Sequence, residues 1–167
     1  MFCTNCGSKI DDGAKFCPEC GKKLVVTYKQ VFERKGQNEE TFIASINQWF
    51  KDNPKAANMK CKFEMDTAVG LMVNKYQMDK FTVEYELFTS ENLNQYAIVK
   101  EEKMGLTKTT AKEYMAQWKE SNPNWKVVTW EGGTHSRGST ASHLLGGFGA
   151  TNRMTVYIVY KFPRKEG

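Results

Sequence analysis

Four cysteines lie within the first twenty residues of this 167-residue chain, in two motifs of the same design. In each motif two residues separate the cysteines and a glycine follows the second one; the motifs are Cys3-Thr4-Asn5-Cys6-Gly7 and Cys17-Pro18-Glu19-Cys20-Gly21. Two intervening residues let both sulfurs of a tight turn face one ion, and the glycine accepts the positive φ that the turn needs. The spacing predicts that Cys3, Cys6, Cys17 and Cys20 bind one structural Zn²⁺.

The residues between the two cysteine pairs are enough for a short hairpin, which Ile10 and Phe16 are expected to cover. A segment this small cannot build a core, so the metal must supply most of its folding energy. Two disulfides or a redox motif are the alternatives. They are disfavoured because no charged and apolar leader precedes the cysteines, and because a redox Cys-x-x-Cys motif usually occurs once. We therefore expect a cytoplasmic protein.

Residues 1–24 resemble the short N-terminal zinc ribbon of many bacterial proteins. The resemblance rests on the pattern Met-x-Cys-x-x-Cys-Gly, the stretch Asp12-Gly13-Ala14-Lys15-Phe16-Cys17-Pro18, and the final Cys-Gly pair. It covers about a seventh of the chain. The resemblance implies a zinc-binding adaptor element in the cytoplasm, but no single function, because such ribbons are attached to many unrelated domains.

The remaining residues, 25–167, are enough for one domain with its own core. The formal net charge is +5, which four thiolates and one Zn²⁺ reduce to about +3. The basic surplus lies in residues 89–167, yet no run of Lys and Arg is longer than two. A strong nucleic-acid footprint would be more basic. No apolar stretch is long enough for a membrane span.

An internal repeat is the clearest feature of this larger domain. The segment Gln48-Trp49 to Asn53-Pro54 returns 69 positions later as Gln117-Trp118 to Asn122-Pro123. Lys80-Phe81-Thr82-Val83 returns 73 positions later as Arg153-Met154-Thr155-Val156. This agreement predicts a duplication, with repeats at 25–88 and 94–162.

Each repeat has the pattern of a β-α-β-β unit. Asn38 in the first repeat, and Thr109 or Thr110 in the second, are placed to cap a helix that a proline later ends. The fold class expected is α+β, with an N-terminal four-cysteine zinc ribbon, one antiparallel sheet of about seven strands, and two helices on one face. Trp49 and Trp118 are expected at equivalent core positions, since each lies on the apolar stripe of its helix.

The two repeats differ most at residues 132–152, which hold six of the chain's thirteen glycines and both histidines. Long glycine-rich loops in compact domains often carry function. One interpretation is a partner-binding loop; the other is a plain hairpin connection. The candidate contact residues are His135, Arg137, His143, Leu144, Leu145 and Phe148.

The chain contains no Walker, HExxH or GxSxG motif, and we expect no catalytic residues. Cys61 is expected to be a buried hydrophobic residue, and the pairs Glu39/Glu40 and Glu101/Glu102 to be solvated. The function that the sequence favours is a bacterial zinc-binding adaptor that binds a protein partner through the ribbon, the glycine-rich loop, or both. The alternative is a protein that binds RNA, DNA or the ribosome; an enzyme is the least favoured class.

Overall fold

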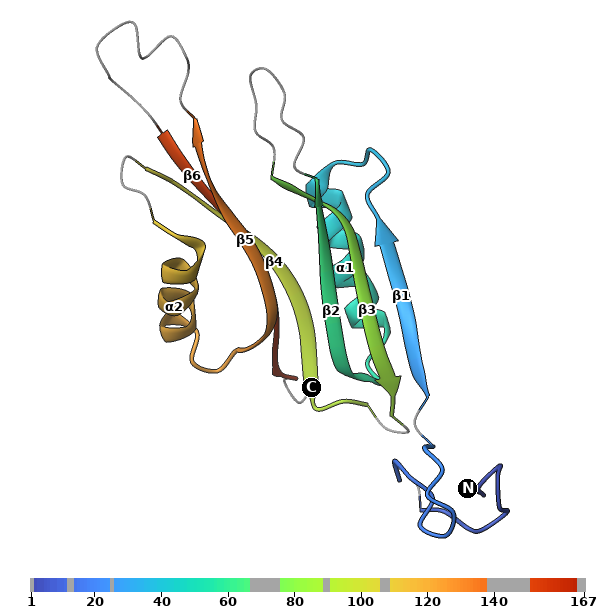
Figure 1. Cartoon of the computed structure of the whole chain (residues 1–167). Helices are drawn as coiled ribbons and strands as arrows, with labels where there is room; N and C mark the ends of the chain where they lie inside the picture. Colours follow the sequence, from blue (N-terminus) through green and yellow to red (C-terminus); the bar gives the residue numbers. More distant parts are fainter. Residues whose placement is uncertain are drawn as a thin grey trace, which may run out of the picture.

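The computed structural model describes residues 2–11, 14–24, 26–66, 76–88, 91–105, 109–137 and 151–164, with the backbone only at 135–137 and 151. Beyond the cysteine-rich segment, these residues form strand, helix, strand, strand, and then the same order again (Figure 1). The first half contains β1 (Thr27–Glu33), α1 (Glu39–Asp52), β2 (Ala56–Asp66) and β3 (Gln77–Leu87). The second half contains β4 (Asn94–Gly105), α2 (Ala111–Ser121), β5 (Lys126–Arg137) and β6 (Thr151–Pro163).

The described strands form two separate antiparallel sheets of three strands each, in the orders β1-β3-β2 and β4-β6-β5. The prediction of a single sheet of about seven strands is therefore wrong for this part of the chain. The connection after β3 gives the physical reason. Phe88 N–H donates to the Lys55 carbonyl oxygen at 2.9 Å, and Asn92 N–H donates to the Pro54 carbonyl oxygen at 2.8 Å. These bonds hold the connection against the turn before β2, and β4 pairs with β6 instead of continuing the first sheet.

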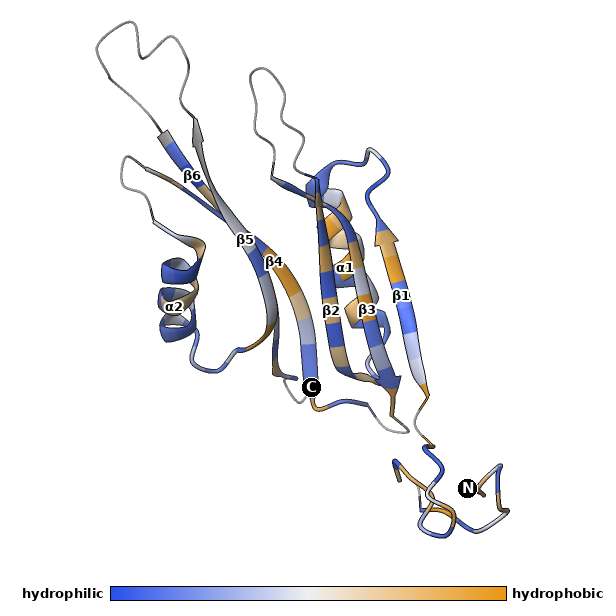
Figure 2. Cartoon of the chain, viewed as in Figure 1, coloured by the Kyte–Doolittle hydropathy of each residue, from blue (hydrophilic) through white to orange (hydrophobic). Residues whose placement is uncertain are grey.

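Helix α1 begins at the predicted cap, where the Asn38 side-chain oxygen accepts from Glu40 N–H at 2.7 Å. Its buried residues Phe42, Ile46 and Phe50 recur about one turn apart, as an amphipathic helix requires. Hydrophobic residues alternate with hydrophilic ones along the neighbouring β2 (Figure 2). The same core cluster includes Met78, Phe81 and Val83 of β3, Tyr96 and Ile98 of β4, and Tyr157 and Val159 of β6. Helix α1 thus joins the two sheets through one core.

Strand β6 is buried on both faces. Its residues Tyr157 and Val159 belong to the α1 core, whereas Met154, Val156 and Ile158 belong to a second cluster with α2. Successive side chains of a strand point to opposite faces, so α1 and α2 cover opposite faces of the second sheet. The prediction that both helices lie on one face of one sheet is wrong. The α2 side of the second cluster consists of Ala111, Met115 and Trp118.

The two helical tryptophans pack in different places. Trp118 is 6% exposed and packs in the second cluster, with its ring 5.5 Å from that of Tyr160. Trp49 is only partly buried and packs beside the first cluster, with its ring 5.1 Å from that of Tyr85. Because each tryptophan faces its own sheet, the prediction of equivalent positions against one sheet is wrong.

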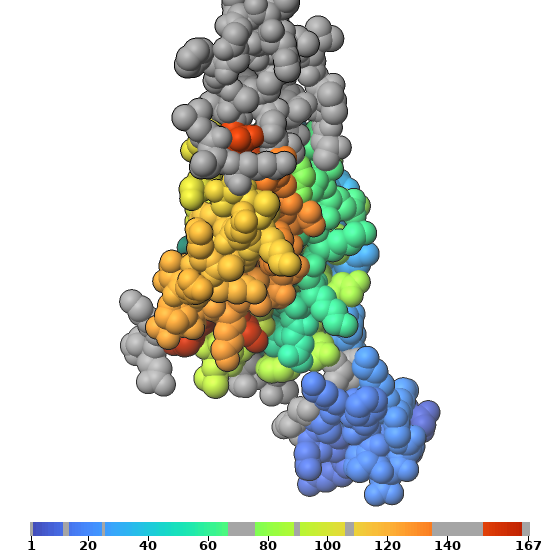
Figure 3. Space-filling model, turned by 60° about the vertical axis from the view of Figure 1, so that its left-hand side comes forward, coloured from blue at the N-terminus to red at the C-terminus, as the bar shows by residue number. Residues whose placement is uncertain are grey.

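The cysteine-rich segment forms a separate small lobe next to the start of β1 (Figures 1 and 3). The space-filling view shows this lobe beyond one end of the larger domain. Among the residues that the structure describes, no helix is long and apolar enough to cross a membrane.

Candidate metal centre

The lobe at residues 2–24 consists of two turns of the same construction, 14 residues apart. In the first turn Cys3 N–H donates to the Ser8 carbonyl oxygen at 2.8 Å, and Gly7 N–H donates to the Cys3 carbonyl oxygen at 2.9 Å. The second turn repeats both bonds 14 positions later at the same lengths. The backbone φ is 74° at Gly7 and 68° at Gly21, which confirms the positive φ predicted for these glycines.

Few apolar residues support this lobe. Ile10, predicted to cover the hairpin, is 2% exposed and packs on Cys3 and Cys17. The prediction that Phe16 shares this role is wrong: Phe16 is 58% exposed, and Phe2, at the equivalent position of the first turn, also points outward at 70% exposure. Two large aromatic side chains are therefore free on the surface of a very small domain.

The Ser8 hydroxyl joins the two turns, since its Oγ lies 3.0 Å from Cys6 Sγ and 3.1 Å from Cys17 Sγ. The pKa of Cys17 is lowered from 9.0 to about 6. The hydrogen bond with Ser8 is the largest cause, and a hydrogen bond with the Cys20 backbone is the next. A thiol with a low pKa is already thiolate near neutral pH, which is the form that binds metal. No sequence pattern pointed to Ser8, because the equivalent residue of the second turn is Lys22.

The sulfur atoms of Cys3, Cys6, Cys17 and Cys20 all lie within 4.8 Å of one another. The distance from Cys3 to Cys20 is 3.6 Å, and that from Cys6 to Cys17 is 3.5 Å. A tetrahedral Zn²⁺ with Zn–S bonds of about 2.3 Å needs sulfur atoms about 3.8 Å apart, so these four thiolates fit one ion. Four protein ligands fill the coordination shell and leave no position for a substrate. This is a structural metal site of the four-cysteine class.

Comparison with known families agrees with this geometry. Residues 2–24 match the family model described as a zinc-ribbon domain, and this segment is therefore a zinc ribbon. No curated protein and no solved structure matches the chain. The larger domain stays unrecognised.

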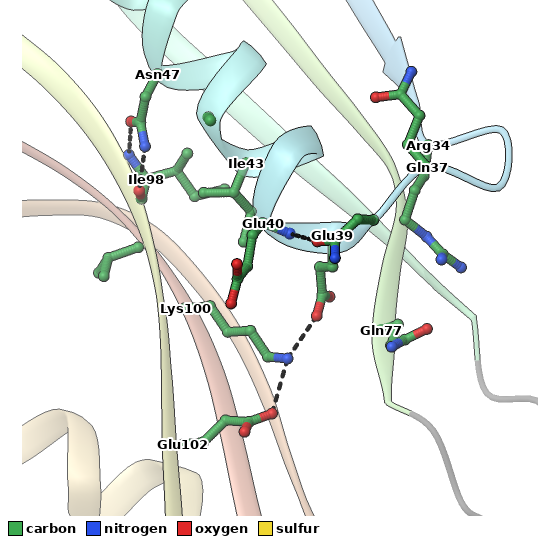
Figure 4. Close-up of a pocket in the computed structure, with 13 residues that line it drawn as sticks. Arg34, Gln37, Glu39, Glu40, Ile43, Asn47, Gln77, Ile98, Lys100 and Glu102 are labelled. Atoms are coloured by element: carbon green, nitrogen blue, oxygen red, sulfur yellow. Dashed lines mark hydrogen bonds and ion pairs between the residues drawn. The ribbon is translucent and has the colours of Figure 1, made fainter.

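A second group of polar residues lies between α1 and β4, in a cavity of about 820 Å³ that is also lined by Arg34 and Gln77 (Figure 4). The Lys100 ammonium lies 2.5 Å from Glu39 Oε2 and 2.8 Å from Glu102 Oε1. Burial lowers the pKa of Lys100, but its hydrogen bonds with Glu102 and Glu39 outweigh this effect and raise the pKa overall. Lys100 therefore stays charged in its ion pairs.

The other carboxylate oxygen of Glu39 accepts from the Tyr157 hydroxyl and from Met78 N–H, the latter at 3.1 Å. Burial, and then the bond with Glu39, raises the pKa of Tyr157, so its hydroxyl keeps the proton that it donates. The Glu39 side chain is only 9% exposed, and the prediction that it is solvated is wrong. These contacts tie the start of α1 to β4 and β6, and they make the group a structural connection.

Only part of the predicted loop 132–152 lies within the described residues. Residues 132–137 belong to β5 and 151–152 to β6, where His135 pairs with Arg153 and Arg137 with Thr151 in the ladder. The other four candidate contact residues, His143, Leu144, Leu145 and Phe148, lie outside the described residues.

One glycine of this segment has a clear packing role. A Cβ atom at Gly132 would lie 2.8 Å from Val156 Cγ2 and 3.1 Å from Ala111 Cβ. The Thr155 carbonyl oxygen of β6 would lie 2.9 Å from the same Cβ atom. Strand β6, and the start of α2 behind it, therefore leave room only for glycine at this position of β5. Part of the glycine content therefore serves the fold.

Cys61 lies on β2 and packs, partly buried, against the α1 core. Burial raises the pKa of its thiol from 9.0 to about 12. Such a thiol is almost entirely protonated at neutral pH, which agrees with the prediction of a hydrophobic role.

Proposed function

We propose that this protein is a non-catalytic zinc-binding adaptor that holds a protein partner through the surface of its zinc ribbon. The observation that supports this most is the exposure of Phe2 and Phe16, at equivalent positions of the two turns. Exposed aromatic rings that a domain does not use in its own core are typical anchors of protein interfaces. Because four cysteines close the coordination shell, the role proposed for the metal is to hold the turns that carry these rings.

The end of the larger domain nearest the ribbon supplies further apolar surface. Val26 precedes Thr27, which pairs with Glu86, so Val26 and Leu87 lie at the same end of the first sheet. Their exposed fractions are 60% and 49%, and Leu93, on the chain between β3 and β4, is 85% exposed. An interface that starts on the ribbon can continue onto this end of the domain (Figure 1).

The charge of the ribbon favours a protein partner over nucleic acid. Residues 1–24 carry four lysines and three acidic side chains, and four thiolates with one Zn²⁺ add two negative charges. The loaded ribbon is therefore close to neutral and slightly negative, whereas binding to phosphates needs a basic surface. RNA, DNA or the ribosome remains the second candidate class, because the C-terminal half is basic.

The test is capture by the immobilised, zinc-loaded chain from a lysate of its source. We expect Phe2→Ser with Phe16→Ser to lose the captured protein while it keeps one zinc per chain. The matched control is Met104→Ser on β4, which removes a side chain that is 65% exposed elsewhere and should capture normally. Loss of capture after nuclease treatment would contradict a protein partner. Tight binding of single-stranded RNA that weakens steeply between low and moderate salt would indicate the second class.

The glycine-rich segment is proposed as a second contact surface on the basis of its sequence. Leu144→Asp with Phe148→Asp is expected to weaken capture and to leave the melting temperature and zinc content nearly unchanged. If this variant captures normally, the segment is only a connection between β5 and β6. If it unfolds the domain, Leu144 and Phe148 belong to a core.

We also infer that the larger domain arose by duplication. The identical strand orders β1-β3-β2 and β4-β6-β5 support this inference. The ends of the two helices, 69 residues apart, also support it. Asn53 Nδ2 donates to the Trp49 carbonyl oxygen, and Asn122 Nδ2 donates to the Trp118 carbonyl oxygen, both at 2.8 Å. A chain of residues 94–164 that folded alone would strengthen the inference.

A further inference from the structure

The outer edge of β1 differs from the other sheet edges that the structure describes. Strands β2 and β5 contact each other. The edge of β4 is occupied by the Asn47 side chain, which accepts from Ile98 N–H at 2.8 Å and donates to the Ile98 carbonyl oxygen at 2.9 Å (Figure 4). Strand β1 forms the outer side of the first sheet, and no described element lies beyond it (Figure 1). An uncovered edge of seven residues is a template for another strand.

The hydrogen bonds with β3 show which backbone groups of β1 face this edge. Arg34 N–H donates to the Asp79 carbonyl oxygen at 2.9 Å, and these two residues continue the register in which Glu33 faces Lys80. Hydrogen-bonded pairs alternate along an antiparallel ladder. Every second residue before Arg34 therefore bonds to β3, and the residues between them point N–H and C=O outward. Within β1 the outward-facing residues are Thr27, Lys29, Val31 and Glu33.

We propose that β1 pairs antiparallel with β1 of a second copy of this chain, around a two-fold axis at Val31. In this register Val31 faces Val31 of the second copy, and Lys29 faces Glu33 on both sides of the axis. Each facing pair exchanges two backbone hydrogen bonds, which gives about six in total. The Gln30 side chain donates to the Val31 carbonyl oxygen at 3.2 Å, as an outward-facing carbonyl permits.

The charges select this register. An axis at Lys29 would place two lysines opposite each other, and an axis at Glu33 would place two glutamates opposite each other; like charges in facing positions destabilise a sheet. With the axis at Val31, both charged pairs are of opposite sign. The exposed Val31 side chain, with 38% of its surface accessible, is covered by its own copy.

The outer face of the first sheet continues the same pattern. Lys29 faces Glu84 of β3, which faces Lys60 of β2, so the charges in this row alternate across the sheet. In the other charged row Glu33 faces Lys80, whose ammonium lies 4.0 Å from Glu64 of β2. Pairing at Val31 places Lys29 of one copy beside Glu33 of the other, so the row that contains Lys29 continues into the row that contains Glu33. The alternation of sign then runs unbroken through six strands.

The dimer has a consequence for the ribbon. Since the two β1 strands run in opposite directions, the two ribbons lie at opposite ends of the shared sheet. A partner with two binding sites would then be held at two points, which raises its effective affinity. The dimer itself does not depend on what the ribbon binds.

Sedimentation equilibrium of the full zinc-loaded chain tests the proposal. The mass should rise with concentration in the micromolar range from 19.1 kDa towards twice that value, since pairing of one edge buries a small interface. Val31→Pro removes the outward N–H, and edge strands tolerate proline where the N–H faces away from the ladder. This variant should keep its thermal melt and stay monomeric, whereas Val31→Thr, which keeps the N–H, should dimerise like the parent.

Charge exchange tests the register without any change to the backbone. Lys29→Glu alone and Glu33→Lys alone place like charges opposite each other in a homodimer, and both should be monomeric. A one-to-one mixture of these two variants restores both opposite-charge pairs and should dimerise again. The proposal is overturned if the parent chain stays monomeric throughout, which would leave the edge for a strand of another protein. It is also overturned if the mixture stays monomeric, or if a dimer forms regardless of all these substitutions.

Discussion

Replacement of Glu39 by alanine tests whether the contacts between α1 and the second sheet stabilise the domain. Glu39→Ala removes the acceptor of three donors: the Lys100 ammonium, the Tyr157 hydroxyl and Met78 N–H. Loss of one partner of a fully buried ion pair costs about 3–5 kcal/mol. The cost here is smaller, because Lys100 keeps its contact with Glu102 at 2.8 Å and its side chain is 23% exposed.

The remaining donors also have weaker alternatives. The Tyr157 hydroxyl lies 3.3 Å from the Tyr76 carbonyl oxygen, and Met78 N–H can donate to the Tyr157 hydroxyl oxygen at 3.3 Å. Hydrogen bonds to a charged group contribute about 1.5–3 kcal/mol. We therefore expect Glu39→Ala to lower the free energy of unfolding by about 2–3 kcal/mol, within the range for a charged acceptor rather than that of a fully buried ion pair.

Urea unfolding of the zinc-saturated protein, followed by tryptophan fluorescence, measures this change. The control is Glu40→Ala, which removes the neighbouring exposed carboxylate and should change the free energy by less than about 0.5 kcal/mol. Tyr157→Phe combined with Glu39→Ala should give a coupling energy of about 0.5–3 kcal/mol, as expected for residues in one network. A loss below about 1 kcal/mol for Glu39→Ala, with no coupling to Tyr157, would refute the reasoning.

Three further predictions concern the metal site, the two tryptophans and the buried thiol. Metal analysis should find about one zinc per chain, which Cys3→Ser with Cys17→Ser abolishes and Cys61→Ala retains; full retention in the double variant would contradict the four-cysteine site. In urea unfolding, Trp118→Ala should cost roughly 3–5 kcal/mol and Trp49→Ala less, because Trp49 is only partly buried; the reverse order would be inconsistent with the two clusters. With a pKa raised from 9.0 to about 12, Cys61 in the folded protein should react with thiol reagents at pH 8 about a thousandfold more slowly than after unfolding. Rapid labelling of Cys61 in the folded protein at pH 8 would contradict the raised pKa. By the same shift, the free energy of unfolding that the neutral thiol contributes is complete below pH 9 and is lost as the pH rises towards 12.

Local features of this protein could be predicted from its sequence alone. The four zinc ligands and the positive φ of Gly7 and Gly21 follow from the spacing within each motif, since metal geometry restricts a tight turn directly. The helix starts at Asn38 and Thr110 were also predictable, because a capping side chain bonds to an N–H two or three residues away. In each case the interacting groups are close neighbours in the chain.

The arrangement of these elements in space was decided by the tertiary structure. Glu39 has the pattern of an exposed residue in the first turn of a helix, but it bonds to Lys100, 61 residues away, and to Tyr157, 118 residues away. No local sequence pattern predicts such contacts, because they depend on β4 belonging to a second sheet and on β6 being covered on both faces. The edge of β1 that no described element covers arises in the same way. Lys29, Val31 and Glu33 form a self-complementary row only because β3 occupies the other side of the strand, which turns their backbone groups outward.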